Sequence, residues 1–341
     1  MSKRRSWKWI GVSVVVFGAL IFSAFALGVA PAASAKTIKW DYTMTTYMPG
    51  TYDDFYQVKE FPRRIMEVTD GAIDITTHIA LLKITDIIDG VRDRRVHMAS
   101  QGTMYRADLA LFNYVTLPGV PFEKLLEIQD KVRPILTKEA LDKFDVVLLG
   151  YGFWPRQTLL SIRPAATFKD LQGLKFRTHS VELLQLLQAI GGTPVSVASS
   201  EVYTALQRKT LEGGVTSLTY MRSGKWIEVG KHVDFWPLGN ACYMFIVNKD
   251  AWNKVPADLQ QKILDESRKI EAEIYAAAAK ADEDDKALLK KLGVTYHYPP
   301  QEQIDKLMDG MVPVIKNWKK RAGPNADAVL AIINEVAGTN F

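Results

Sequence analysis

Short apolar runs alternate with amphipathic segments along most of the chain, and this alternation restricts the folds available to it. Residues 37–43, 72–77 and 96–100 have the length and composition of strands, whereas residues 52–68 and 84–91 between them have helical spacing. Strands joined by crossover helices lie parallel in one sheet, because each helix returns the chain to the same end of that sheet. We therefore expect an α/β fold that begins with a parallel, doubly wound sheet.

A second set of strands and helices follows Tyr151. Its expected elements are, in order, a strand at 157–162, a strand containing Arg177, a helix at 181–190 and a strand at 194–197. Apolar runs at 145–149 and 243–247 are placed to connect the two sets. The chain is therefore expected to cross between two α/β units more than once.

The last third of the chain is helical in character. Between Pro256 and Leu292 there is no Gly and no further Pro, and a proline suits the first turn of a helix. This pattern predicts one long helix lying across both units. A coiled-coil dimer arm is the alternative, although the apolar positions do not keep a heptad for three repeats. Two further helices are predicted at 299–320 and 326–336.

The amino-terminal segment has the pattern of an export signal. Four Lys and Arg residues within the first eight positions precede an almost wholly apolar run at 10–30, and Ala33-Ser34-Ala35 forms a small-residue cleavage site. We expect residues 1–35 to be a cleaved signal peptide that directs the protein to the periplasm, by either the general or the twin-arginine route. An uncleaved membrane anchor is the alternative, since the apolar run is long enough to span a bilayer.

The basic excess of the chain belongs to this amino-terminal segment. Residues 1–35 hold four of the 43 Lys and Arg residues and none of the 38 acids, which leaves 39 basic against 38 acidic residues. Nearly equal numbers of basic and acidic residues give no electrostatic reason to expect binding of nucleic acid. Cys242 is the single cysteine and cannot form an internal disulfide, so burial of apolar surface must stabilise the fold. The remaining length suits two domains.

Residues 170–178 place one arginine at the end of a buried strand. Leu174 and Phe176 alternate there with Lys175 and Arg177, which is the period of a short strand. A guanidinium held in that position matches a carboxylate through two parallel hydrogen bonds. The same pattern is compatible with a structural arginine paired with an acidic neighbour.

Four segments together resemble the solute-binding proteins of TRAP (tripartite ATP-independent periplasmic) transporters, of the dicarboxylate-binding DctP type. They span nearly all of the chain after residue 35 and lie, in order, at 67–75, 168–177, 201–207 and 245–261. The resemblance implies a two-lobed periplasmic binding protein fold with a hinge, a long helix spanning both lobes and a ligand enclosed between them. The expected lobes are lobe I at 36–153 plus 242–275 and lobe II, with the bridging and C-terminal helices, at 154–241 plus 276–341.

The resemblance also implies roles for individual residues. Arg177 corresponds to the arginine that clamps a carboxylate, and Arg156 to a second arginine in the same pocket. Thr216 stands where the family usually has an Asn that reaches the ligand, and this departure weakens the case for a typical C4-dicarboxylate.

Four more candidate residues are suggested by side-chain chemistry and position. Trp154 and Trp236 would suit a ligand with one carboxylate and an apolar or aromatic body, although core packing is the alternative for both. Tyr47 and Gln101 follow or end two predicted strands, where open α/β sheets bind their ligands.

We expect a monomeric receptor that binds an organic carboxylate and delivers it to a TRAP-type membrane permease. A binding protein of an ABC importer and an exported enzyme acting on an organic acid are the alternatives. The five histidines have no metal-ligand spacing, and no catalytic or nucleotide-binding motif follows a strand, so no enzyme activity, cofactor or metal is expected. The acidic runs Asp53-Asp54 and Glu283-Asp284-Asp285 are expected to be solvated on helix faces.

Overall fold

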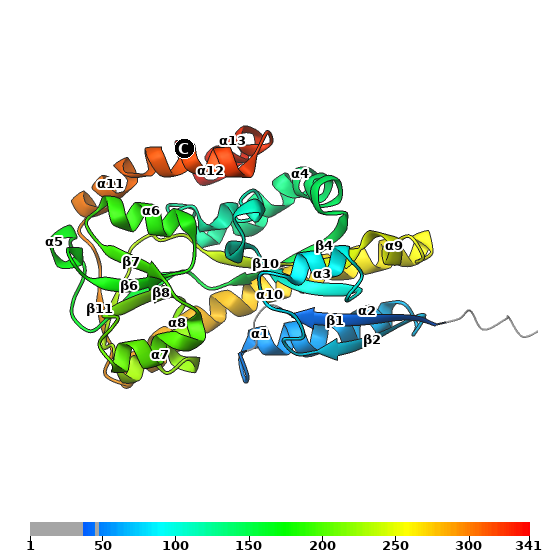
Figure 1. Ribbon diagram of the computed structural model, residues 1–341, viewed down its shortest axis with the longest axis horizontal. Helices are drawn as coiled ribbons and strands as arrows, with labels where there is room; N and C mark the ends of the chain where they lie inside the picture. Colours follow the sequence, from blue (N-terminus) through cyan, green and yellow to red (C-terminus); the bar gives the residue numbers. More distant parts are fainter. Residues whose placement is uncertain (1–36, 45–47) are drawn as a thin grey trace, which may run out of the picture. The chain divides into compact units, whose positions relative to one another are not determined.

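Two mixed β-sheets with flanking helices form the part of the chain that the computed structural model describes, residues 37–44 and 48–341 (Figure 1). The predicted signal peptide and Tyr47 lie outside these residues. Residues 37–341 form one compact unit. We call the part built on the first sheet the first lobe and the part built on the second sheet the second lobe.

The first sheet has the strand order β2-β1-β3-β10-β4. Its strands are β1 (Ile38–Met44), β2 (Ile73–His78), β3 (Met98–Gly102), β4 (Val146–Trp154) and β10 (Ala241–Asn248). The strands β1, β2 and β3 are parallel, which confirms the expectation for the beginning of the chain. The strand β10 is antiparallel to both of its neighbours, because it enters from the other lobe, so the complete sheet is mixed rather than parallel.

The second sheet has the strand order β11-β9-β5-β8-β6-β7. Its strands are β5 (Thr158–Ser161), β6 (Lys175–Thr178), β7 (Thr193–Ser196), β8 (Gly213–Thr216), β9 (His232–Asp234) and β11 (Thr295–His297). Arg177 lies on β6, which pairs in parallel with β7 on one side and β8 on the other. The predicted arginine strand is therefore an inner strand of its sheet.

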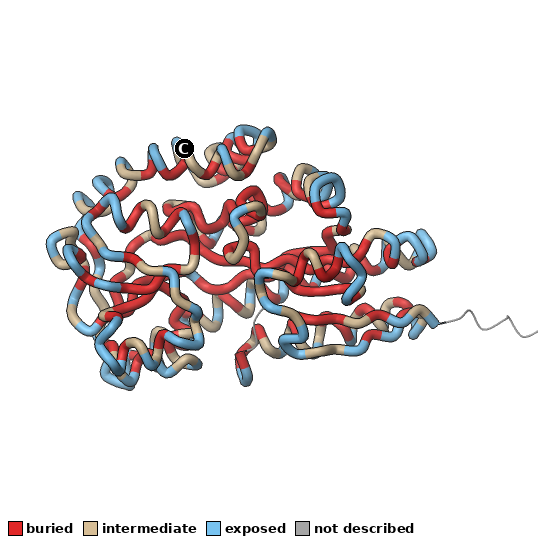
Figure 2. The backbone as a smooth tube through the Cα atoms, viewed as in Figure 1, coloured by how far each residue is buried: buried red, intermediate tan, exposed pale blue. Residues whose placement is uncertain are grey.

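Helices flank both sheets, and the buried residues lie along the strands and on the helix faces that pack against them (Figure 2). The shorter helices are α1 (Tyr52–Asp54), α2 (Phe61–Val68), α3 (Ile87–Arg92), α4 (Leu125–Phe144), α5 (Phe168–Leu171), α6 (Val181–Ala189), α7 (Ser199–Gln207), α8 (Leu218–Ser223) and α9 (Lys249–Trp252). The helix expected at 52–68 contains a π-helical turn, η1 (Phe55–Glu60), between α1 and α2. Pro62 lies just after this π-helical turn, and its missing N–H interrupts the hydrogen-bond ladder at this point of the helical run.

The chain passes between the sheets at residues 155–157 and again at 235–240. These two crossing segments are joined by a hydrogen bond of 3.1 Å from the Gln157 N–H to the Gly239 carbonyl. Gly239 has a φ of +78°, and a Cβ atom there would lie 2.7 Å from the Thr116 carbonyl oxygen. Only glycine fits this position without displacing the backbone of the first lobe.

A third connection is the long helix α10 (Ala257–Lys291), which confirms the predicted helix (Figure 1). Its 35 residues extend for about 50 Å, and it contacts β4 and α2 of the first lobe and α8 of the second. The helix therefore spans both lobes. The exact lobe boundaries stay a prediction, since α12 contacts α6 whereas α13 contacts α4.

Four buried acids on α10 each pair with an arginine from a different part of the chain. The pairs are Glu266 with Arg64, Glu271 with Arg133, Asp282 with Arg156 and Asp285 with Arg222. The expectation that the acidic run at 283–285 is solvated is wrong for Asp285, which is 4% exposed. Asp285 follows Asp282 by three positions and therefore lies on the same inner face of the helix.

The single helix expected at 299–320 is divided into α11 (Gln301–Asp309) and α12 (Met311–Ala322). Gly310 separates them, and Pro313 follows in the first turn of α12, where it cannot donate a hydrogen bond back to α11. The expectation of one continuous helix was therefore wrong. The final helix, α13 (Ala326–Ala337), agrees with its predicted position.

We predict that Glu271→Ala lowers the free energy of unfolding by about 3–5 kcal/mol, because it leaves Arg133 without its buried partner. Glu271 is 2% exposed, accepts two hydrogen bonds from Arg133 at 2.9 and 3.2 Å, and accepts a third from the Tyr151 N–H at 3.0 Å. Urea unfolding monitored by tryptophan fluorescence measures the change. Asp284→Ala, which removes an exposed pair with Lys280 on the same helix, should change stability by less than about 0.5 kcal/mol. Equal effects of the two variants would contradict the assignment.

Candidate ligand-binding site

Arg177 is a buried cation that donates hydrogen bonds to neutral oxygens. It is 3% exposed, and it donates to the carbonyls of Val197 at 3.2 Å and Val215 at 2.9 Å and to the Ser199 hydroxyl at 2.6 Å. The Tyr105 hydroxyl, from the first lobe, also interacts with the guanidinium. Within the described residues no carboxylate forms an ion pair with Arg177.

The burial of Arg177 makes its charge costly. Burial lowers the pKa of Arg177, although an arginine still keeps its proton at neutral pH. Below the guanidinium lies the Trp226 ring, whose centroid is 5.9 Å from Cζ. Gly214 leaves room for this ring, since a Cβ atom at that position would lie 2.8 Å from it. An aromatic face offsets part of the charge, but an anion would offset far more.

A small cavity beside Arg177 has about 30 Å³ of space accessible to water-sized molecules. Both lobes line it: Met48, Met104, Tyr105, Trp154 and Ala241 come from the first, Arg177, His179, Ser199, Thr216, Ser217 and Tyr220 come from the second, and Gln157 comes from a crossing segment. Trp154 and Thr216 end their strands, and Arg177 is one residue from the end of its strand. The cavity therefore lies at the carboxyl ends of strands, where α/β sheets bind ligands.

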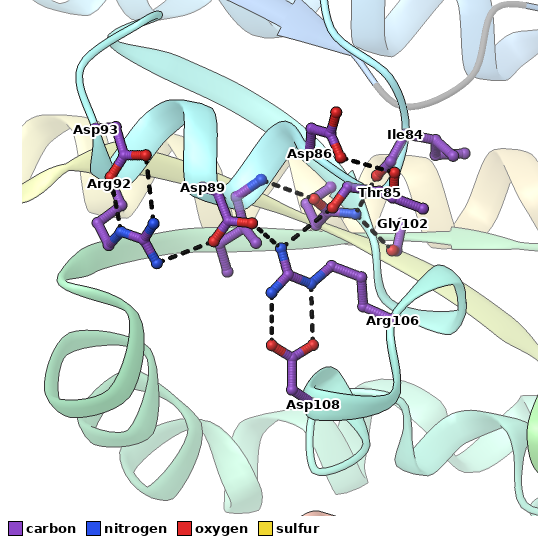
Figure 3. A network of polar contacts seen from close by, with 11 residues as sticks. Ile84, Thr85, Asp86, Asp89, Arg92, Asp93, Gly102, Arg106 and Asp108 are labelled. Atoms are coloured by element: carbon purple, nitrogen blue, oxygen red, sulfur yellow. Dashed lines mark hydrogen bonds and ion pairs between the residues drawn. The ribbon is translucent and has the colours of Figure 1, made fainter.

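Arg106, the residue after Tyr105, is held in the first lobe by a network of ion pairs and hydrogen bonds (Figure 3). Arg106 forms two parallel hydrogen bonds of 2.9 and 2.6 Å with the Asp108 carboxylate. It also pairs with Asp89 and donates to the Thr85 carbonyl at 3.1 Å. This network fixes the segment after β3 against α3, and Tyr105 is held at the cavity wall as a result.

Trp154 is fixed by a buried carboxylate behind it. Its indole Nε1–H donates to Asp53 Oδ2 at 3.0 Å, and Asp53 is fully buried. The expectation that Asp53 is solvated was therefore wrong, because the helical turn that begins at Tyr52 directs Asp53 inward. Burial raises the pKa of Asp53 to about 6, and hydrogen bonds from Trp154, Gln57 and Tyr243 reduce this shift.

His179 follows Arg177 by two residues and also lines the cavity. Its Nε2 lies 2.9 Å from Gln157 Oε1, while Nδ1 is buried and has no hydrogen-bond partner within the described residues. Burial, together with the charge of Arg177, holds the pKa of His179 well below its usual range. The ring is therefore neutral at neutral pH.

The structure brings three of the seven candidate residues together. Arg177, Trp154 and Thr216 line one cavity, whereas Tyr47 lies outside the described residues. Trp236 is 2% exposed, stacks on Phe168 and donates to a backbone carbonyl, away from the cavity.

Two more candidates lie elsewhere, and any contact of theirs with a ligand stays a prediction. Gln101 is buried and uses its amide on three backbone groups, the Ile88 N–H and the carbonyls of Ile84 and Gly102. Arg156 lines a different cavity near α10 and forms ion pairs of 3.3 Å with Glu123 and Asp282.

Several cavity residues were not among the candidates. Tyr105 and Ser199 follow predicted strands in the same way as Tyr47 does, so the rule on strand ends could have included them. Met48 and Met104 follow the same predicted strands as Tyr47 and Tyr105, but an apolar side chain at a strand end does not by itself indicate a ligand site. Ser217 is adjacent to the candidate Thr216.

The described part of the chain holds neither a metal-binding cluster nor a membrane-spanning helix. No group of three or more His, Cys, Asp or Glu side chains there could hold a metal ion. No helix in the same residues has both the length and the apolar character required to cross a membrane. Cys242 is buried beside Thr103, and burial raises the pKa of its thiol to about 12, which makes it unreactive.

Comparisons with known proteins agree with this architecture. The family model for bacterial extracellular solute-binding proteins of family 7, DctP, matches residues 47–321. The C4-dicarboxylate-binding periplasmic protein DctP of Rhodobacter capsulatus is 26% identical over 331 residues, which cover 93% of this chain and 97% of that protein.

Solved structures share the fold. DctP7, a Bordetella pertussis extracytoplasmic solute receptor binding pyroglutamic acid, matches with a TM-score of 0.79 at 23% identity and covers 87% of this chain and 99% of its own. A TRAP periplasmic solute-binding protein from Desulfovibrio salexigens with bound orotic acid matches with a TM-score of 0.78 at 19% identity, over 89% of this chain and 99% of its own.

We predict that Asp53→Asn flattens the pH dependence of stability. Because the folded state raises the pKa of Asp53 from 3.8 to about 6, folded protein binds this proton more tightly, and the unfolding free energy should rise as pH falls from about 7 to about 4. The neutral asparagine can still accept from Trp154, so the variant should be more stable at pH 7.5 by about 1–3 kcal/mol. Urea unfolding at several pH values measures both effects, and Asp54→Asn controls for net charge. A variant with the wild-type pH profile would refute the role of Asp53.

Proposed function

The chain belongs to family 7 of the bacterial extracellular solute-binding proteins, and from this premise we propose that it captures a small monocarboxylate between its two lobes. The observation that carries the proposal is Arg177, a buried cation on a cavity wall with no carboxylate partner among the described residues. An anionic ligand would supply the missing negative charge. A carboxylate also matches the planar fork of the guanidinium.

The charges of the cavity favour one carboxylate over two. Arg177 is the one permanently charged side chain among the described lining residues, and the neighbouring His179 is neutral. A second carboxylate would lose its hydration on entering the cavity, and no second cation lines the cavity to pair with it. Burying an unpaired anion is unfavourable. A C4-dicarboxylate is therefore a poorer match than a monocarboxylate.

The rest of the wall favours an apolar or ring-containing body. Tyr105, Trp154 and Tyr220 provide aromatic surface, and Met48 and Met104 provide apolar surface that adapts to shape. Thr216 and the two serines of the second lobe offer hydroxyls that can donate or accept. Pyroglutamic acid and orotic acid, bound by the two structural relatives, are ring-containing monocarboxylates, whereas the Rhodobacter relative is named for C4-dicarboxylates.

We further propose export to the periplasm after cleavage of residues 1–35, and delivery of the ligand to a TRAP-type permease. The two crossing segments, 155–157 and 235–240, are proposed as the hinge. A ligand that contacts Arg177 and Tyr105 at once would favour the closed arrangement, because it gains contacts with both lobes only there. Family membership and the amino-terminal pattern support these steps.

We predict that Arg177→Ala strongly weakens carboxylate binding. The test measures the thermal midpoint of the purified protein with monocarboxylates, dicarboxylates, aromatic acids and sugar acids, and a ligand at about a hundred times its Kd should raise the midpoint by several degrees. In Arg177→Ala the affinity should fall by about 2–5 kcal/mol, and Arg177→Lys should bind more weakly than wild type because it lacks the fork. Arg208→Ala, an exposed arginine of the same lobe, is the matched control. Unchanged affinity in Arg177→Ala would refute the proposal.

We predict that a monoamide binds more tightly than the corresponding diacid. Succinamate and succinate have nearly the same shape, but succinamate carries one carboxylate and therefore leaves no anion without a cation in the cavity. The expected preference is about tenfold or more, measured by isothermal titration calorimetry at neutral pH. Tighter binding of succinate would indicate a dicarboxylate receptor.

A further inference from the structure

Two N–H groups of Arg177 are left over from the hydrogen bonds that hold its side chain. The Nε–H donates to the Val197 carbonyl, while Nη1 and Nη2, which carry two N–H groups each, donate one hydrogen bond each, to the Val215 carbonyl and the Ser199 hydroxyl. One N–H therefore remains on each terminal nitrogen. With these two groups Arg177 can bind a carboxylate through two hydrogen bonds.

The Tyr105 hydroxyl already interacts with this guanidinium. A guanidinium only donates, so the tyrosine oxygen faces the remaining N–H groups as an acceptor. Tyr105 belongs to the first lobe: its ring packs against the core cluster that contains Met104 and Trp154, and the next residue, Arg106, forms ion pairs with two aspartates. Arg177 lies on the second sheet. The contact between Tyr105 and Arg177 therefore joins the two lobes directly.

A ligand carboxylate and the Tyr105 hydroxyl compete for the same N–H groups. A carboxylate held by two hydrogen bonds requires both remaining groups of Arg177, whereas the hydroxyl engages at least one of them. Space imposes the same choice, since the cavity has about 30 Å³ accessible to water-sized molecules, which is room for about one or two waters. An acid as large as pyroglutamate does not fit while Tyr105 stays against Arg177.

The tyrosine can give way to an anion when the lobes separate. Its ring is held by the first lobe, so the hydroxyl leaves Arg177 as that lobe moves. A hydrogen bond between two charged groups is stronger than one between a charged group and a neutral hydroxyl. A carboxylate therefore displaces the hydroxyl from the guanidinium, whereas water, which is neutral, has no such advantage.

We propose that the Tyr105 hydroxyl takes the place of the ligand carboxylate on Arg177 in the ligand-free protein, holds the two lobes together there, and is displaced when an acid binds. This inference rests on the proposed function and adds a competitor that belongs to the protein itself. The Tyr105 ring stays on the cavity wall beside the ligand, and only the hydroxyl loses its partner. The affinity for an acid is lowered as a result, because only protein in which the contact is broken can bind.

Removal of the hydroxyl should tighten binding. In calorimetric titrations with pyroglutamate, orotate and mandelate, Tyr105→Phe should bind each acid that the wild-type protein binds about 3- to 30-fold more tightly. Tyr56→Phe, which removes a hydroxyl of the first lobe outside the cavity, should bind like wild type. Equal or weaker binding by Tyr105→Phe overturns the proposal for Tyr105 and leaves the carboxylate receptor intact. Absence of binding by all three acids to both proteins overturns both.

The rates of binding distinguish a competitor from a group that holds the bound ligand. Trp154 lines the cavity, so stopped-flow tryptophan fluorescence can follow binding. Tyr105→Phe should associate with the acid faster, by about the same factor as its gain in affinity, and its dissociation rate should stay within about twofold of the wild-type rate. Faster dissociation without faster association would mean that the hydroxyl holds the bound ligand, and this result overturns the proposal.

The contact between the lobes can also be measured without any ligand. The thermal midpoints of ligand-free wild type, Tyr105→Phe, Arg177→Met and the double variant form a double-mutant cycle. Because either substitution removes the same contact, the midpoint of the double variant should fall by about 1–4 °C less than the sum of the two single changes. Additive changes overturn the proposal, since they show that the two side chains are not coupled in the ligand-free protein.

Discussion

The pairing of buried acids on α10 with four arginines holds the two lobes to one common helix. Arg64 and Arg133 come from the first lobe, Arg156 from a crossing segment and Arg222 from the second lobe. A buried ion pair contributes little net stability compared with apolar packing, but it tolerates very few positions of its partners. The pairs are therefore best understood as fixing where the helix lies along both lobes. The cavity, whose walls come from both lobes, depends on that placement.

Arg177 differs from these four arginines in the groups that surround it. The four arginines that pair with α10 are neutralised by carboxylates of the chain itself, whereas Arg177 is surrounded by carbonyl and hydroxyl oxygens and an aromatic ring. Neutral oxygens orient a guanidinium without cancelling its charge. In the proposed function, the guanidinium is thus already oriented before an anion arrives, so its own side chain requires little reorganisation on binding.

A site residue could be predicted where neighbouring residues in the sequence determine its position, and could not be predicted where distant contacts do. Arg177 could be predicted because strand alternation and its sequence motif both lie within ten residues. Arg156 could not be placed from the sequence. It lies two residues after Trp154, which lines the cavity, but the direction of its side chain depends on its ion pair with the distant Asp282. The division at Gly310 had a local signal in Gly310 and Pro313, but the burial of Asp53 and Asp285 had none, because their inner neighbours come from distant parts of the chain. Most elements were found, and the errors about which side chains are buried arose where distant contacts decide.

The position of β10 in the first sheet has a consequence for the order in which the protein can fold. The strands β3 and β4 have no common neighbour until β10, residues 241–248 of a chain of 341, lies between them. A ribosome that has made the first two hundred residues has therefore not yet supplied the strand that completes the first sheet. The first sheet can therefore be completed only after nearly three quarters of the protein has been synthesised. If the chain is exported unfolded, as the general route would require, this late completion keeps it compatible with passage through a membrane channel.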